Sequence, residues 1–132
     1  MANNRYRLKP EEEALILNYR KYSKNNVLVI GDIHEPFTLD GYLEFCLEQY
    51  HKHECNEVVF IGDIIDNLYA SYHETPTCAM GGDNELELAI KKLAKWYEAF
   101  DKATVIIGNH DRLIMRKAQT SNIPSKWIKS YK

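Results

Sequence analysis

Apolar and polar positions follow one another along the chain in blocks that predict strands separated by helices. Three short apolar runs each end at a glycine, which is a turn signal. Continuous apolar runs of this length are typical of strands buried on both faces of a parallel sheet. The predicted strands are Val27–Ile30, Glu57–Ile61 and Ala103–Ile107.

Segments with helical spacing of apolar residues lie before, between and after these strands. Pro10 and the three glutamates that follow it suit the first turn of a helix. Asp40 is placed to cap a second helix. The predicted helices are about Lys9–Tyr22, Asp40–Lys52, Asn84–Phe100 and Arg112–Ala118.

This order of elements predicts an α/β fold, a parallel βαβαβ layer preceded by an N-terminal helix. Because strands alternate with helices, we expect helices to cover both faces of the sheet. The crossovers are expected to be right-handed. We expect residues 1–24 to form a basic, helical extension and residues 25–132 to form the N-terminal part of one domain. Residues 67–83 carry a proline and two adjacent glycines. They predict an inserted loop or lid, because loops of this length are usually functional or mobile.

Composition and charge narrow the class of protein. Of 132 residues, 45% are hydrophobic and 27% are charged, a balance typical of one soluble globular domain. The net charge of −2 argues against a protein that coats nucleic acid, but not against an enzyme that cuts it. No apolar run is long enough to cross a bilayer and no apolar signal opens the chain, so we expect a cytoplasmic protein without a membrane partner. Cys46, Cys55 and Cys78 form no Cys-x-x-Cys motif, which favours free thiols in a reducing compartment.

Residues able to bind metal follow each predicted strand. The three motifs are Gly31-Asp32-Ile33-His34, Gly62-Asp63-Ile64-Ile65-Asp66 and Gly108-Asn109-His110-Asp111. The carboxyl ends of parallel strands meet at one edge of the sheet, where open α/β sheets bind ligands. Carboxylate, amide and imidazole donors together suit Mn²⁺, Fe, Zn²⁺ or Ni²⁺. Asp63 lies on the middle motif, where its carboxylate is placed to bridge two ions about 4 Å apart.

The three motifs in this order, each after an apolar strand, resemble those of the calcineurin-like metallophosphoesterases. The resemblance covers Val27 to Arg112. It implies a hydrolase with two divalent metal ions, of which manganese is favoured, that cleaves phosphate monoesters or diesters with a metal-bound hydroxide. The implied substrate is a phosphate ester, with a nucleotide or nucleic acid weakly preferred. The implied fold of residues 25–132 is about half of the family's α/β sandwich.

The resemblance also assigns roles to individual residues. Asp32 and His34 hold the first ion, Asp63 bridges both ions, and Asn109 holds the second ion and contacts the substrate. His110 is not a ligand; it stabilises the phosphoryl oxygens or protonates the leaving group.

Two carboxylates and a loop histidine complete this assignment. The resemblance pairs Asp66 with His110, whose tautomer and charge it would set, in agreement with the general behaviour of carboxylate–imidazole pairs. For Asp111 we favour a helix cap over a catalytic role. His73 is a candidate for substrate contact, although an ordinary exposed loop histidine is the favoured interpretation.

The chain departs from the family's pattern. The family carries a Gly-His motif and a Gly-His-x-His motif in its second half, and no histidine follows His110 here. His51 and His53 lie at a helix end, where solvated histidines are expected. We therefore expect the N-terminal half of the domain, with partial metal occupancy and weak or no activity. Asn67 stands where protein phosphatases of the superfamily carry an arginine, which argues against a protein serine/threonine phosphatase.

Two other classes stay open. The first is a non-catalytic, truncated or split half that binds metal or self-associates through an exposed sheet face, as a homodimer or with a separate C-terminal half. The second, weaker one is a Mg²⁺-dependent phosphotransferase, which is less consistent with histidine and asparagine ligands because Mg²⁺ prefers carboxylates and water.

Overall fold

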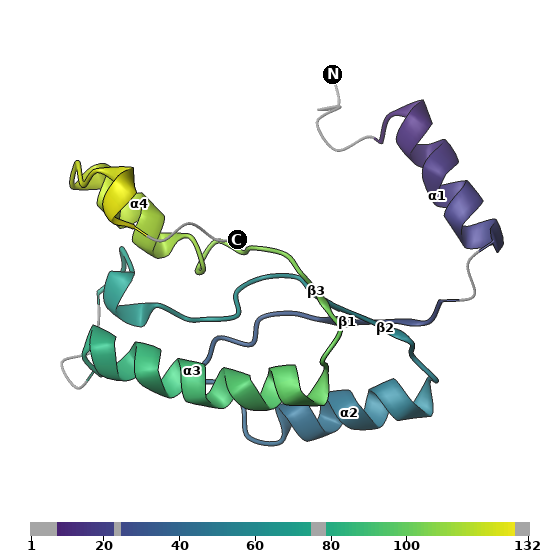
Figure 1. The fold of residues 1–132 in the computed structure, drawn as a ribbon, viewed down its shortest axis with the longest axis horizontal. Coiled ribbons are helices and arrows are strands. Elements are labelled where there is room, and N and C mark those ends of the chain that lie inside the picture. The colour runs from purple at the N-terminus through teal and green to yellow at the C-terminus, as the bar shows by residue number, and fades with distance from the viewer. Residues whose placement is uncertain (1–7, 23–24, 75–78, 129–132) are drawn as a thin grey trace.

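The computed structural model describes residues 8–22, 25–74 and 79–128. Helices and strands alternate along this part of the chain (Figure 1). The helices are α1 (Pro10–Tyr22), α2 (Tyr42–Lys52), α3 (Gly82–Ala99) and α4 (Leu113–Thr120), with 3₁₀ turns η2 (Leu68–Ala70) and η3 (Ser125–Trp127). The strands are β1 (Val27–Ile30), β2 (Glu57–Phe60) and β3 (Thr104–Val105).

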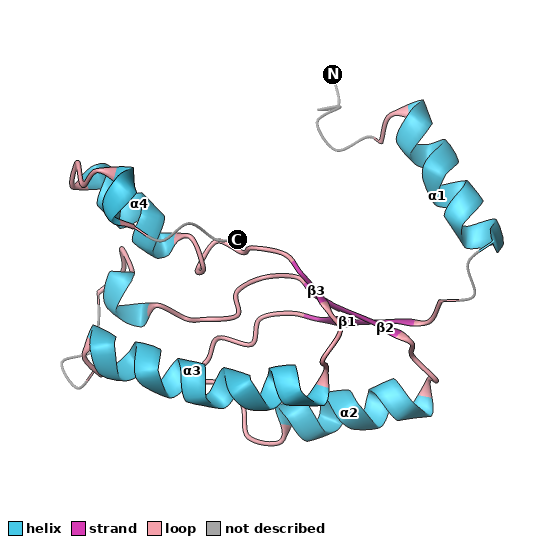
Figure 2. Ribbon diagram, in the orientation of Figure 1, coloured by secondary structure: helices cyan, strands magenta, loops and turns pink. Residues whose placement is uncertain are grey.

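The three strands form a parallel sheet in the order β1-β2-β3. Ile30 is level with Phe60, and Phe60 in turn is level with Val105. Figure 2 shows the loops after the strands leaving the sheet toward the end where η2 and α4 lie. The predicted α/β class, a parallel βαβαβ layer preceded by a helix, is confirmed.

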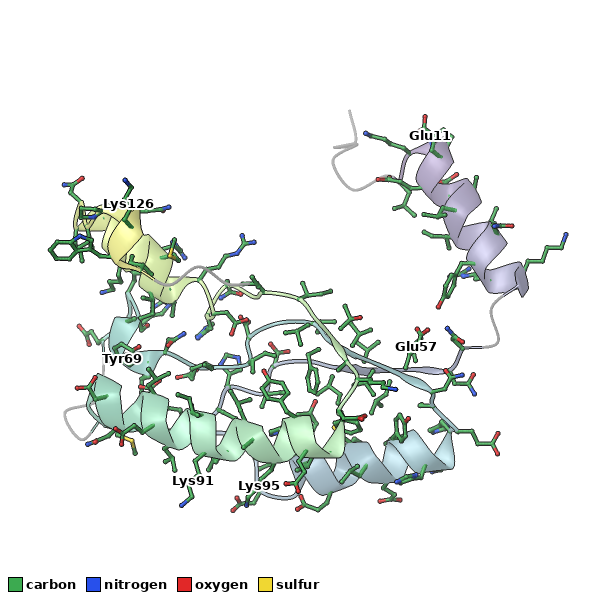
Figure 3. All side chains as sticks on the ribbon, viewed as in Figure 1. Glu11, Glu57, Tyr69, Lys91, Lys95 and Lys126 are labelled. Atoms are coloured by element: carbon green, nitrogen blue, oxygen red, sulfur yellow. The ribbon has the colours of Figure 1, made fainter. Side chains whose placement is uncertain are left out.

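The core lies between the sheet and the helices α2 and α3. Alternate strand residues, among them Ile30 and Phe60, pack with Trp96 of α3 and with Phe100, which directly follows α3. The rings of Phe60 and Trp96 meet edge to face with centroids 6.2 Å apart, a favourable aromatic arrangement. Lys91 and Lys95 project from the opposite side of α3, away from the sheet (Figure 3).

Within residues 8–22, 25–74 and 79–128, no helix packs on the other face of the sheet, called the bare face below, so the expectation of strands buried on both faces is wrong. Val29, Ile61 and Ile106 are 56%, 50% and 50% exposed. In a sheet of order 1-2-3, crossovers of one hand return along the same side. Both crossover helices, α2 and α3, therefore cover the same face (Figure 1).

Most element boundaries differ from the prediction by one or two residues, and three features differ more. The third strand is limited to Thr104–Val105, and both residues are exposed. Asp40 does not cap α2, because Gly41 holds the N-cap position in a left-handed conformation (φ 84°) and no side chain caps the helix. The segment 67–83 is not wholly a loop, since it contains η2 and the first residues of α3; its residues 75–78, which include Cys78, lie outside the described part.

Helix α1 stands apart from the sheet on the side of the bare face (Figure 1). Its Leu15 and Leu17 are exposed. Near the C-terminal end of α1, the Tyr19 hydroxyl donates a hydrogen bond of 3.3 Å to the carboxylate of Glu57 in β2. None of the helices in the described residues is long and apolar enough to span a membrane. The division into residues 1–24 and 25–132 stays a prediction.

Candidate metal centre

The loops after the three strands are joined by hydrogen bonds. The His34 N–H donates to the Asp63 carbonyl at 2.9 Å and the Glu35 N–H to the Ile64 carbonyl at 2.9 Å, which joins the first loop to the second. The His110 N–H donates to the Asp63 carboxylate at 2.8 Å, which joins the third loop to the second. Residues far apart in sequence thus share one small region at the carboxyl edge of the sheet.

Three of the predicted metal ligands lie together there. Asp32, His34 and Asp63 each offer a ligand atom, and these atoms lie within 4.8 Å of one another. His34 Nε2 is 3.8 Å from Asp32 Oδ1, and the Asp32 side chain is open to solvent. Two carboxylates and an imidazole fit a divalent transition-metal ion. Their convergence is what a shared ion requires, while the binding itself stays a prediction.

The third loop brings its histidine to the same place. The rings of His110 and His34 meet edge to face, with centroids 4.6 Å apart and planes at 77°. Asn109 precedes His110 and is exposed. Asn109 thus lies at the same edge of the sheet. The contact of its side chain with an ion or a substrate stays a prediction.

Asp66 lies between the two histidines. Its Oδ1 is 2.7 Å from His34 Nδ1 and 3.4 Å from His110 Nδ1. His110 Nδ1 is instead 2.7 Å from the backbone oxygen of Asp66. The carboxylate is therefore nearer to His34 than to His110, the partner expected from the sequence.

Several residues of the site hold a left-handed backbone. The φ angles of Asp32, His34 and Asp63 are 52°, 50° and 51°. Such angles are uncommon outside glycine and cost about 1–3 kcal/mol where the conformation is strained. They persist because the surrounding hydrogen bonds over-determine them, and they are concentrated at functional sites.

Sequence analysis missed the role of Asp111, a buried residue. Its carboxylate accepts hydrogen bonds from the backbone N–H groups of Asp63 (3.0 Å), Ile64 (3.0 Å), Ile65 (3.2 Å) and Gly108 (2.8 Å). The expected helix cap is wrong, because no side chain caps α4. The only sequence signal for Asp111 was its place directly after Gly-Asn-His. That position does not tell whether the carboxylate caps the following helix or binds backbone N–H groups of two loops.

Two glycines allow the second and third loops to approach closely. Gly62 has a φ of 100°, and a Cβ built on it would lie 2.5 Å from Gly108 Cα. A Cβ on Gly108 would overlap the Asp63 carboxylate and backbone nitrogen. The position of Asp63 thus depends on glycine at the start of the third loop.

Side chains behind the loops hold them in place. The Tyr42 hydroxyl of α2 donates to the Gly31 carbonyl at 3.2 Å. Burial, followed by the neighbouring Cys46, raises the pKa of this hydroxyl, so it stays protonated and able to donate. The buried Asn67 donates from Nδ2 to the His110 carbonyl at 3.0 Å. Asn67 therefore supports the third loop, a role that the sequence did not indicate.

The remaining histidines lie elsewhere. His73 is exposed after η2, and its backbone N–H donates to Ser71 Oγ at 3.1 Å. Its contact with a substrate stays a prediction. His51 and His53 are exposed at the C-terminal end of α2, as expected for solvated histidines.

Comparison with known protein families gives a match. A family model described as calcineurin-like phosphoesterase matches residues 26–131, nearly the whole chain after α1. No curated protein and no solved structure matches the chain.

Proposed function

The chain belongs to the calcineurin-like phosphoesterase family, and on this premise we propose that it is a metal-dependent hydrolase of phosphate monoesters or diesters. The observation that carries the proposal is the convergence of Asp32, His34 and Asp63 within 4.8 Å, with His110 beside them. Strand-end carboxylates and imidazoles so arranged are the donor set that a hydrolytic metal centre uses.

We propose a division of the ligands between two ions. Asp32 and His34 hold the first ion, Asp63 lies between both ions, and Asn109 holds the second. When bound, divalent ions polarise the phosphoryl oxygens and activate a water molecule. Manganese is the ion we favour, with Fe, Zn²⁺ and Ni²⁺ as alternatives of similar donor preference. Because these four side chains are the only ligands that we propose for two ions, we expect the metal sites of this chain to be partly occupied and its activity to be weak.

His110 has the geometry of a substrate-facing group. Its Nδ1 is held by the Asp66 backbone oxygen at 2.7 Å, so its Nε2 is left to act on the substrate. In the proposed reaction His110 stabilises the phosphoryl oxygens or donates a proton to the leaving group, and Asn109 contacts the same phosphate. His73 is a further candidate for contact with the rest of the substrate.

The proposal extends to the substrate class and to the location of the protein in the cell. Among phosphate esters we favour a nucleotide or nucleic acid. We propose a cytoplasmic location, in keeping with the free thiols of Cys46 and Cys55, since a reducing compartment keeps such thiols unpaired.

Metal analysis of an Asp63 variant tests the site. We expect Asp63→Ala to lose the bound ion, measured by elemental analysis after equilibration with Mn²⁺, together with hydrolysis of a generic phosphodiester. Asp63→Asn is a second variant, because its carbonyl can still accept the His110 N–H bond and preserve the loop. Asp83→Ala, at an exposed carboxylate in the first turn of α3, is the matched control. Unchanged metal content in both Asp63 variants would contradict the assignment.

A non-catalytic, self-associating module is the second candidate, because of the bare sheet face. Exposed apolar surface around Val29, Ile61 and Ile106 favours association. The partner would be a second copy of the chain or a separate polypeptide that supplies the family's C-terminal half. The mass of the protein in solution tests whether a second copy is the partner, since a strict monomer at high concentration argues against a homodimer.

A further inference from the structure

We infer that Asp66 is a positioning residue for His34: its carboxylate accepts the His34 Nδ1–H and thereby presents Nε2 to the ion. His110 is oriented separately, by the backbone carbonyl of Asp66. This inference rests on the proposed metal-dependent function, and it departs from the pairing of Asp66 with His110 that the sequence suggested.

The two ring nitrogens of His34 face different carboxylates. Nδ1 is 2.7 Å from Asp66 Oδ1, a normal hydrogen-bond distance, whereas Nε2 is 3.8 Å from Asp32 Oδ1. An ionised carboxylate can only accept, so the proton lies on Nδ1 and the lone pair on Nε2. Nε2 therefore faces the group formed by Asp32 and Asp63, where the ion is expected. A ligating histidine held through its other nitrogen is the usual arrangement at metal sites.

His110 does not depend on the carboxylate in the same way. Its Nδ1 is 2.7 Å from the Asp66 carbonyl oxygen, an obligatory acceptor, and 3.4 Å from the Asp66 carboxylate. The second distance is beyond the usual range of an N–H···O bond. Removal of the Asp66 side chain should therefore leave the His110 tautomer in place.

The backbone of Asp66 is fixed independently of both imidazoles. The Asp66 N–H donates to the Glu35 carbonyl at 3.0 Å, which joins it to the first loop. The next residue, Asn67, donates to the His110 carbonyl at 3.0 Å, which joins it to the third loop. One residue thus offers its side chain to the first loop's histidine and its carbonyl to the third loop's histidine.

The test reads imidazole tautomers by ¹⁵N NMR in the metal-free protein, at a pH where both rings are neutral. In the unmodified chain we expect His34 and His110 both to carry the proton on Nδ1. In Asp66→Ala we expect His34 to shift to the Nε2–H form while His110 keeps Nδ1–H. Mn²⁺ titration of the same variant should show affinity lowered about 10–100-fold.

The outcomes separate this inference from the proposed function. An Nε2–H form of His34 in the unmodified chain overturns the inference without any variant, so failure of Asp66→Ala to fold does not block the test. A change at His110 with His34 unaltered also overturns it. Absence of Mn²⁺ binding by the unmodified chain contradicts the proposed function, while the tautomers still decide the role of Asp66. Asp83→Ala is the control and should leave both tautomers and the affinity unchanged.

Discussion

Aspartates at the strand ends have two different environments. The Asp32 side chain is open to solvent, as suits a group that binds a ligand. Asp111 is buried and accepts four backbone N–H groups from the second and third loops. Hydrogen bonds to a charged acceptor contribute about 1.5–3 kcal/mol each in favourable cases. Asp111 therefore assembles the site without belonging to its reactive surface.

Glycine at position 108 is predicted to be necessary for the placement of Asp63. In Gly108→Ala the new methyl group overlaps the Asp63 carboxylate and backbone, so the second and third loops must separate. We expect a loss of about 1–3 kcal/mol in the free energy of unfolding, measured by urea denaturation, together with weaker Mn²⁺ binding. Gly81→Ala is the control, because a Cβ there meets nothing within 4 Å. Equal behaviour of the two variants would show that the close approach of the loops is not required.

At the residue scale, the sequence was sufficient to predict which side chains lie together at the edge of the sheet, but not all of their hydrogen-bond partners. Asp32, His34 and Asp63 were predicted as a group because each follows a strand of one parallel sheet. The sequence could not predict which of the two imidazoles lies nearer to the Asp66 carboxylate. The two distances depend on the paths of three loops, and differences of about an ångström decide which hydrogen bond forms.

At the scale of elements, the first residues of η2 are bound by one side chain that is distant in sequence. Glu85 in the first half of α3 is fully buried, and its carboxylate accepts the Leu68 N–H at 2.8 Å and the Tyr69 N–H at 3.4 Å. These N–H groups belong to the first residues of the 3₁₀ turn, where the helical hydrogen-bond pattern offers no backbone acceptor. Glu85 thus joins η2 to α3 through these two hydrogen bonds.

We predict that Glu85→Gln loosens η2. The amide offers one acceptor in place of two, so one N–H group loses its partner at a cost of about 1–3 kcal/mol. Hydrogen exchange should become faster at the Leu68 and Tyr69 amides than at the amides of β2. Glu87→Gln, at an exposed position of the same helix, should leave these rates unchanged. Unaltered exchange in the Glu85 variant would contradict the role of its carboxylate.

The elements themselves were predicted to different accuracy. Helix α1 was expected at about Lys9–Tyr22 and is observed at Pro10–Tyr22, because proline and the acidic first turn mark its beginning. The strand expected at Ala103–Ile107 is only Thr104–Val105. An apolar run shows that a strand can form, but the length of pairing depends on the neighbour, and β3 pairs with β2 only at Val59 and Phe60.

At the scale of the molecule, the described part of the chain covers one face of the sheet with helices and leaves the other face bare. Val58 is 5% exposed on the helix side and Val29 is 56% exposed on the other. Because both helices return on one side, apolar residues of the second face are available for contact with another surface. The same asymmetry underlies the proposal that the chain associates with a second copy or a separate half.

A pair of matched substitutions tests this asymmetry. Val58→Thr buries a hydroxyl group and should lower the free energy of unfolding by about 1–3 kcal/mol. Val29→Thr should change it by less than about 0.5 kcal/mol, since the site is exposed and both residues favour strands. Urea denaturation at low protein concentration measures both. A large loss from Val29→Thr under these conditions would mean that the second face is covered in solution.

The sequence by itself determined the order of the elements, the parallel sheet and the edge at which the reactive residues lie. These features depend on local periodicity and on short motifs after each strand, which a chain carries in its own residues. Only the tertiary structure decided which face of the sheet the helices cover, and which imidazole lies nearer to the Asp66 carboxylate. It also decided which backbone N–H groups the Asp111 carboxylate accepts. Those outcomes depend on how separate loops and helices pack against one another, and no local pattern contains the distances between them.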